Sequence, residues 1–172
     1  TLDGSNGFRL DGIDEDDYSG HSVSSAGDVN GDGYADILVG AYRADRHAGE
    51  TYVVFGSGSG FAASLDLSTL DGSNGFRLDG IDADDRSGIS VSTAGDVNGD
   101  GFADILVGAY GAASAAGETY VVFGGDFTES VTHAGTTADD TLTGDGSANV
   151  MIGGQGDDIL DGKGGADVLY GA

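Results

Sequence analysis

The 172-residue chain contains no cysteine and no proline, and only 6 of its residues are lysine or arginine. Without cysteine no disulfide can staple the fold, although this does not fix the compartment. No apolar run approaches the roughly 18 residues that a membrane-spanning helix needs, so we expect no membrane insertion. No secretory signal is visible at Thr1-Leu2-Asp3. A signal removed on maturation, or carried elsewhere in a longer chain, would not be seen here.

The scarcity of basic residues leaves a formal net charge of −24, with 30 acidic residues. Such a charge disfavours nucleic acid and anionic membranes as partners and favours dissolved cations. Of the acidic residues 26 are Asp, which favours turns and can reach a metal from a tight loop. A solvated, salt-tolerant surface would also explain the charge, but Asp recurs at regular places in two different repeats, which strengthens the metal interpretation.

A nine-residue segment, Asp28 to Asp36 (loop 1), recurs 68 positions later as residues 96–104 (loop 2) with one change, Tyr34 to Phe102. Each loop has short oxygen donors at its first, third, fifth and ninth positions, with glycines between them. These donors are Asp28, Asn30, Asp32 and Asp36 in loop 1 and Asp96, Asn98, Asp100 and Asp104 in loop 2. Like charges about 4 Å apart repel by ~4 kcal/mol at an effective dielectric of 20, so three carboxylates in one loop indicate a cage for a cation.

The donor set of each loop also indicates which metal it would hold. All the donors are oxygen, with no Cys or His, which disfavours zinc and copper. A flexible loop suits calcium better than magnesium, which keeps its waters in a rigid octahedron. An EF-hand is excluded, because it needs Glu at the twelfth position, where this chain has Val39 and Val107. An Asx-rich hairpin turn without metal stays open as the alternative.

The two loops belong to a longer repeat, in which residues 2–56 align with 70–124 without a gap and 46 of the 55 positions are identical. Each unit has four short runs rich in β-branched and aromatic residues, separated by glycine, and no convincing helical periodicity. The runs in the first unit are 8–10, 22–24, 37–39 and 51–55. They predict about four antiparallel strands per unit, the size of one propeller blade.

A second repeat, with a period of nine, begins at Gly135 and continues at Gly144, Gly153 and Gly162. Its position six is Asp, Asn, Asp and Asp, and its position eight is Leu, Met, Leu and Leu. Each unit predicts a Gly/Asp turn followed by a very short strand with one inward apolar side chain. Stacked turns of this kind form a parallel β-roll that binds calcium between turns.

Together the repeats predict an all-β chain in two domains. Residues 1–126 would form two antiparallel β-propeller-like blades, and residues 127–172 a short parallel β-roll, with the junction near 125–134.

The 68-residue units resemble FG-GAP repeats, the blades of the integrin α-subunit type β-propeller. They share Ser-Gly-x-Ser-Val-Ser, Asp-x-Asn-x-Asp-Gly-x-x-Asp and Asp-Ile-Leu-Val-Gly-Ala. The namesake motifs differ, since Phe-Gly reads Ser19-Gly20 and Ser87-Gly88, and Gly-Ala-Pro reads Gly40-Ala41-Tyr42 and Gly108-Ala109-Tyr110. The resemblance implies calcium held by the side chains of loops 1 and 2, with help from the backbone carbonyls of Tyr34 and Phe102.

The nonapeptides resemble the RTX (haemolysin-type) calcium-binding repeat, Gly-Gly-x-Gly-x-Asp-x-(apolar)-x. Residues 153–161 match it fully, the unit from Gly162 departs only at Lys163, and the two earlier units are degenerate. The metal ligands that this resemblance implies are Asp140, Gly153, Gln155, Asp158, Gly162, Gly164 and Asp167. It also implies type I secretion from a Gram-negative bacterium and calcium-triggered folding outside the cell, hence a secreted or cell-surface location.

Signals for catalysis are weak, and we expect no enzyme activity. His21 and His47 are replaced by Ile89 and Ala115 in the second unit, and no Gly-x-Ser-x-Gly elbow occurs. Differences between the units concentrate at 43–47, which is either a recognition loop, for an acidic sugar or a neighbouring subunit, or an ordinary loop that has drifted. The acidic stretches 14–17 and 82–85 favour solvated turns over further metal sites.

Two blades cannot close a ring, since propellers usually need four to eight. By analogy with the family, the Phe8 strand would complete a preceding blade, and the unit ending at Gly124 lacks a following one. Such exposed edges pair with something. We expect as partners either further repeats of a longer chain or neighbouring copies that complete one another's blades.

The sequence therefore predicts a calcium-dependent, self-associating, secreted structural or adhesive module of a bacterial surface or matrix. The alternatives are a lectin-like propeller that binds glycans and a non-catalytic part of a secreted enzyme.

Overall fold

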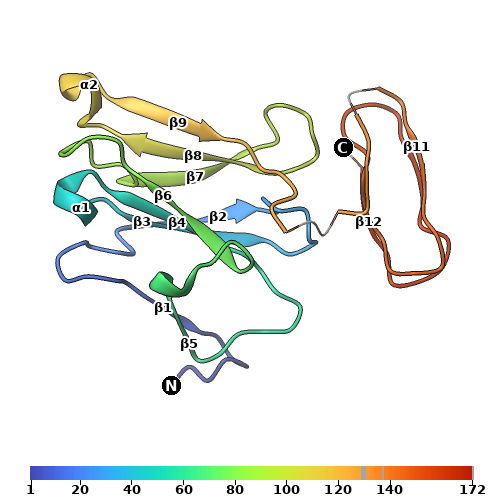
Figure 1. Cartoon of the computed structure of the whole chain (residues 1–172), viewed down its shortest axis with the longest axis horizontal. Coiled ribbons are helices and arrows are strands. Elements are labelled where there is room, and N and C mark those ends of the chain that lie inside the picture. Colours follow the sequence, from blue (N-terminus) through green and yellow to red (C-terminus); the bar gives the residue numbers. More distant parts are fainter. Residues whose placement is uncertain (129–130, 137, 172) are drawn as a thin grey trace.

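The structure, a computed structural model, describes residues 1–128, 131–136 and 138–171. Antiparallel sheets occupy the region of the two long repeats, and short parallel strands occupy the region of the nonapeptides (Figure 1). The predicted all-β class, with two blade-like sheets followed by a β-roll, is thus confirmed. The predicted junction includes residues 129 and 130, which lie outside the described residues.

The first blade is a four-stranded antiparallel sheet in the order β2-β3-β4-β6. Its strands are β2 (Ser22–Gly27), β3 (Asp36–Ala41), β4 (Glu50–Val54) and β6 (Gly75–Asp79). The first three come from the first repeat, whereas β6 comes from the second. The first blade therefore takes its fourth strand from the repeat that follows it.

The second blade has only three strands, β7 (Ser90–Gly95), β8 (Asp104–Ala109) and β9 (Glu118–Val122). Its register repeats that of the first blade, since Ile105 pairs with Val122 as Ile37 pairs with Val54. Within the described residues β9 pairs with β8 alone, so the edge of β9 that corresponds to the β6 position is open.

The N-terminal strand β1 (Arg9–Asp11) corresponds to β6 in the repeat but pairs in parallel with β5 (Ser64–Asp66). The 3₁₀ turn η1 (Leu67–Thr69) follows β5, and the Asp66 side chain caps it by accepting a hydrogen bond from the Ser68 amide.

Two single turns, α1 (Ala44–His47) and α2 (Ala112–Ala115), connect the last two strands of each unit. Two inner residues of α1, Asp45 and Arg46, have positive φ, as have Ala113 and Ser114 in α2. Turns this short and irregular carry no helical periodicity, which is why the sequence pattern does not indicate them.

The first blade is buried on both faces. One face packs against the second blade through Ala26, Val29, Leu38, Val53, Phe55 and Ile105. The other face forms a second apolar cluster that includes Val39, Tyr52 and Leu67, against which Leu10 and Leu65 of β1 and β5 pack. The alternation of Val53 and Tyr52 between these clusters follows from the two-residue period of a strand.

The β-roll consists of two parallel ladders, β10-β12-β14 and β11-β13. Its strands are β10 (His133–Ala134), β11 (Thr141–Thr143), β12 (Val150–Ile152), β13 (Ile159–Asp161) and β14 (Val168–Tyr170). Paired residues are 18 positions apart, as in Val150↔Val168, so two nonapeptides make one coil. Figure 1 shows the roll beside the end of the blades that lies opposite α1 and α2.

Candidate calcium sites

Loop 1 is closed by the carboxylate of its first residue. Asp28 Oδ1 accepts hydrogen bonds from the amides of Gly31 (2.7 Å) and Asp32 (3.1 Å), and Oδ2 accepts one from Gly33 (3.0 Å). Gly31 and Gly33 have φ of +74° and +94°, a conformation that favours glycine. The backbone is thus wrapped around the Asp28 carboxylate.

Asp36 ties loop 1 to the sheet. Its side chain is buried, Oδ2 accepts from the Val29 amide and Oδ1 from the Gly56 amide, both at 2.8 Å. Burial raises the pKa of Asp36 to about 6 against the effect of these two hydrogen bonds, and the nearby Asp28 and Asp32 raise it further. A cation in the loop would stabilise the ionised form that burial disfavours.

Loop 2 has the same internal geometry. Asp96 accepts from Gly99 (2.6 Å), Asp100 (3.2 Å) and Gly101 (2.9 Å), which are the counterparts of the three donors in loop 1. Asp104 accepts from Val97 (2.7 Å) and from Gly124 (2.9 Å) beyond β9. Loops 1 and 2, which repeat in sequence, therefore have equivalent hairpin conformations.

The donor chemistry of both loops fits calcium. Within the described residues no three carboxylate or imidazole side chains converge as a ligand set, and the network is that of Asx turns. Carboxylate oxygens have further lone pairs beyond the amide hydrogen bonds, and each loop adds an amide oxygen. The predicted ligands remain Asp28, Asn30, Asp32, Asp36 and the Tyr34 carbonyl in loop 1, and Asp96, Asn98, Asp100, Asp104 and the Phe102 carbonyl in loop 2.

Asp158 gives the clearest indication of a cation in the β-roll. Its Oδ1 accepts from the Asp140 amide of the neighbouring coil (2.9 Å). In the described part of the chain its Oδ2 is buried and has no hydrogen-bond partner. A buried carboxylate oxygen without a partner is costly, and a calcium ion between the coils would satisfy it.

The position-six side chains of the four nonapeptides, three of which are predicted ligands, lie in two columns. Asp140 and Asp158 form one column, and Asn149 and Asp167 form the other, with the Asp167 Oδ1 accepting from the Asn149 amide at 3.0 Å. In three units a Cβ on the position-one glycine would overlap the position-six side chain, as Gly144 with Asn149, Gly153 with Asp158 and Gly162 with Asp167. At Gly135 a Cβ would overlap the Gly153 carbonyl instead. Gly164 donates its amide to the Asp145 carbonyl (3.2 Å).

The β-roll packs directly on loops 1 and 2, which the sequence pattern does not indicate. A Cβ at Gly101 would overlap the Ile152 side chain, a Cβ at Gly33 would contact Val168 and Tyr170, and one at Gly99 would overlap the Gln155 side chain. The pKa of the Tyr170 hydroxyl is raised by burial and by its hydrogen bond to Asp28. The loop glycines therefore serve the contact with the roll as well as the turn.

The segment 43–47 is held by contacts within the blades. The Arg43 guanidinium lies over the Tyr18 ring, 4.4 Å from its centroid, and His47 Nδ1 lies 3.2 Å from Asp84 Oδ1. In the acidic stretch 82–85 the Asp82 amide donates to Asp85 Oδ2 (3.1 Å), which closes a turn.

Comparison with known families matches both repeat systems. Residues 19–54 and 87–122 match the FG-GAP repeat, and residues 134–169 match the RTX calcium-binding nonapeptide repeat (4 copies). Integrin alpha pat-2 of Caenorhabditis elegans is 35% identical over 119 residues, 67% of this chain and 9% of that protein. Integrin alpha-IIb of Mus musculus is 38% identical over 125 residues, 67% of this chain and 11% of that protein. The chain thus spans about a tenth of the length of these relatives.

Proposed function

Since the chain carries FG-GAP repeats at 19–122 followed by RTX calcium-binding nonapeptide repeats at 134–169, we propose that it is a calcium-dependent, secreted structural or adhesive module that self-associates through its incomplete blades. Its setting would be a bacterial surface or extracellular matrix. We assign it no catalytic role.

The proposal rests on the open edge of β9, in blades that also carry the two candidate calcium sites, loops 1 and 2. Within the described residues β9 has a strand on one side only, whereas its counterpart β4 has strands on both. An open, apolar strand edge is a site for pairing with another chain. The function would thus depend on the chain that pairs with β9. Calcium would fix the conformation of loops 1 and 2, which connect strands of the two blades.

Secretion is supported by the calcium dependence that the loops and the roll imply. Extracellular modules bind calcium with dissociation constants of about 10⁻⁴–10⁻³ M, so such sites fill outside the cell and stay largely empty in the cytosol. Among the described residues, no helix is long and apolar enough to cross a membrane.

Light scattering of the chain at millimolar calcium and after chelation tests the proposal. We expect oligomers in calcium and smaller, less stable species in chelator. A well-folded monomer that is indifferent to calcium would contradict it.

One observation favours glycan binding as a second candidate. Tyr18 is exposed and lies under Arg43, and the His21 and Tyr42 rings are tilted against each other, with ring centroids 4.5 Å apart. An aromatic face beside a cation suits an acidic sugar. A glycan-array signal that is lost on replacing Arg43, Arg46 and His47 would support this candidate.

A further inference from the structure

The second blade lacks cover at the positions where the first blade has it. Val53 and Phe55, on the face of the first blade that the second blade covers, are 0% and 3% exposed, whereas Val121 and Phe123, on the corresponding face of the second blade, are 47% and 53% exposed. Beside the open edge of β9 lies a hollow of about 230 Å³, lined in part by Leu78, Tyr120 and Val122. This hollow makes the position of the missing fourth strand apolar and accessible.

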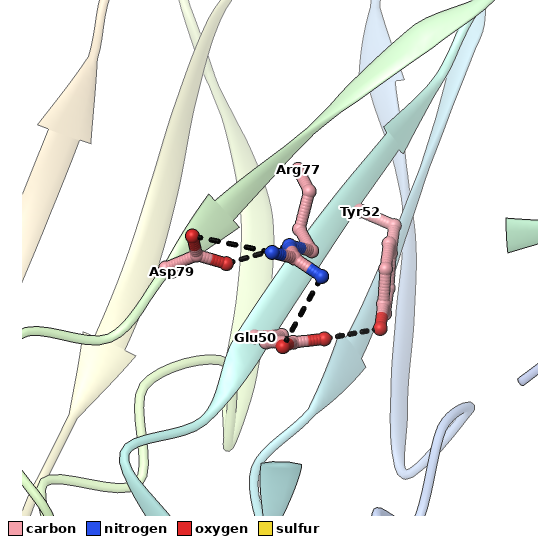
Figure 2. Close-up of polar contacts among 4 residues, drawn as sticks. All are labelled: Glu50, Tyr52, Arg77 and Asp79. Carbon is pink, nitrogen blue, oxygen red and sulfur yellow. Dashed lines mark hydrogen bonds and ion pairs between the residues drawn. The ribbon is translucent and has the colours of Figure 1, made fainter. Parts of the chain in front are cut away.

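The first blade shows which strand fits such an edge. There β6 pairs with β4 from Val54↔Gly75 to Glu50↔Asp79. Arg77 of β6 forms an ion pair across the two strands with Glu50 of β4 (Nη1 to Oε1, 3.5 Å) (Figure 2). Within β6 Arg77 also pairs with Asp79 (Nε to Oδ1, 2.6 Å), and within β4 the Tyr52 hydroxyl hydrogen-bonds to Glu50. The Arg77–Glu50 contact thus marks the register of β6 on β4, and Asp79 and Tyr52 hold its two partners from their own strands.

The same four residue types occur a second time, as Arg9 and Asp11 on β1 of the first repeat and as Glu118 and Tyr120 on β9 of the second repeat, but these two pairs do not meet within one chain. The Tyr120 hydroxyl donates to Glu118 Oε2 at 2.5 Å on β9. Arg9 donates to Asp11 on β1, with Nη2 2.9 Å from Oδ2. Arg9 and Glu118 correspond to Arg77 and Glu50, and the contact between them is the one that a donated strand would add.

Strand β1 has two edges. The edge that would pair with β9 of another copy is the one that β5 leaves free. The Arg9 amide donates to the Ala63 carbonyl (3.1 Å), so the odd-numbered residues of β1 face β5. In the first blade the Phe55 amide donates to Asn74 and the Gly80 amide to Gly49, so the even-numbered residues of β6 face β4. Because strand backbones alternate, Phe8 and Leu10 present their amides and carbonyls on the edge that β6 uses for pairing.

We propose that the strand Gly7–Asp11 of a second copy of this chain adds to the open edge of β9 as its fourth strand, antiparallel and in one register. The pairs are Val122↔Gly7, Val121↔Phe8, Tyr120↔Arg9, Thr119↔Leu10 and Glu118↔Asp11. Arg9 of one copy then contacts Glu118 of the other. This inference rests on the proposed self-association and specifies its partner and register.

Charge reversal in two separate chains tests the register. We expect Arg9→Glu alone and Glu118→Arg alone each to weaken self-association in calcium about tenfold or more, measured by sedimentation velocity. An equimolar mixture of the two variants should regain association, because the two substituted side chains have opposite charges and meet across the interface. Glu15→Arg, on an exposed acidic turn, makes the same change in net charge as Glu118→Arg; it is the matched control and should leave association unchanged.

Disulfide trapping gives a second measurement, made simple by the absence of cysteine from the chain. Paired residues of antiparallel strands have Cα atoms about 4.5–5.5 Å apart, within disulfide range. A chain with Leu10→Cys mixed with a chain with Thr119→Cys should form the mixed disulfide on mild oxidation. Leu10→Cys mixed with Tyr120→Cys should not, because adjacent residues of a strand point to opposite faces.

The outcomes separate this inference from the proposed function. A wild-type chain that remains monomeric in calcium would contradict both, and would leave further repeats of a longer chain as the occupant of the β9 edge. A chain that oligomerises but is insensitive to both charge reversals, or that forms the two mixed disulfides equally, would overturn only the strand and register proposed here.

Discussion

The Ile152 side chain, from strand β12 of the roll, lies against Gly101 in loop 2 so closely that a Cβ at Gly101 would overlap its Cγ2. Ile152 is almost fully buried, and it also lies within contact range of a Cβ at Gly31 in loop 1. Ile152 of the roll therefore lies against both loop 1 and loop 2. Calcium in the loops and docking of the roll should consequently depend on each other.

The first prediction concerns this contact. Gly101→Ala should release the roll from the blades, because it introduces an overlap with Ile152 as well as strain at a φ of +86°. Left-handed strain costs about 1–2 kcal/mol, and overpacking adds about 1–3 kcal/mol. Limited proteolysis should then cut between the blades and the roll at least several times faster than in the wild-type chain.

The matched control is Gly95→Ala in the same blade. Gly95 also has a positive φ (+73°), but a Cβ there would meet nothing within 4 Å. It should lose stability through strain alone and leave the roll docked. Equal protease sensitivity of the two variants would contradict the docking assigned to Ile152.

The conformation of loops 1 and 2 is well predicted from the sequence, because the hydrogen bonds and glycines that form each turn lie within a few residues of one another. The Asx turn around Asp28 uses only the next five residues, and the glycines at its turns can be located from their spacing. The strands are also predictable, since runs such as 37–39 are short, rich in β-branched residues and followed by glycine.

Contacts between distant segments are not predictable from such local signals. Nothing about Gly101 distinguishes a glycine needed for a turn from one needed for the approach of Ile152, because positive φ alone would explain it. The pairing of β1 with β5 is equally hidden, since the sequence of β1 repeats that of β6 while their partners differ. The unpaired Oδ2 of Asp158 depends on the stacking of coils 18 residues apart.

The second prediction concerns metal removal. Calcium at 100 times its dissociation constant should stabilise the chain by about 2.7 kcal/mol per independent site. For a chain of this size each kcal/mol corresponds to about 2–4 °C, so one site should raise the melting temperature by about 5–10 °C. Differential scanning calorimetry with calcium, with magnesium and with chelator checks this, and an equal effect of magnesium would contradict the calcium assignment.

The third prediction separates the roll from the blades through Asp158. Without metal, Asp158→Asn should be neutral or stabilising, because it removes the charge from a buried oxygen that has no partner within the described residues. In calcium the same change should be destabilising by about 1–3 kcal/mol, because a charged ligand is lost. The sign of the effect should therefore invert on adding calcium.

Asp157→Asn is the control for this inversion. Asp157 precedes Asp158 and is exposed, so the same change in net charge should alter stability by no more than about 0.5 kcal/mol in either condition. Isothermal unfolding in urea with and without calcium measures both variants. A destabilising effect of Asp158→Asn in chelator would show that its carboxylate is needed for hydrogen bonding rather than for metal.

The last prediction uses the unequal burial of the two repeats. Thr51 on β4 is fully buried, and within the described residues its hydroxyl has no hydrogen-bond partner, whereas the counterpart Thr119 on β9 is exposed. Thr51→Val keeps the shape and removes the unsatisfied hydroxyl, so it should stabilise the chain by about 1 kcal/mol, or about 2–4 °C in melting temperature. Thr119→Val should change stability by less than about 0.5 kcal/mol in the monomer, because water solvates its hydroxyl. If Thr119→Val also stabilises the chain, and does so only at concentrations where it self-associates, β9 is covered in the oligomer as β4 is covered in the first blade. Thermal unfolding of both variants across a wide range of protein concentration distinguishes these outcomes, and a destabilised Thr51→Val variant would contradict the unsatisfied hydroxyl.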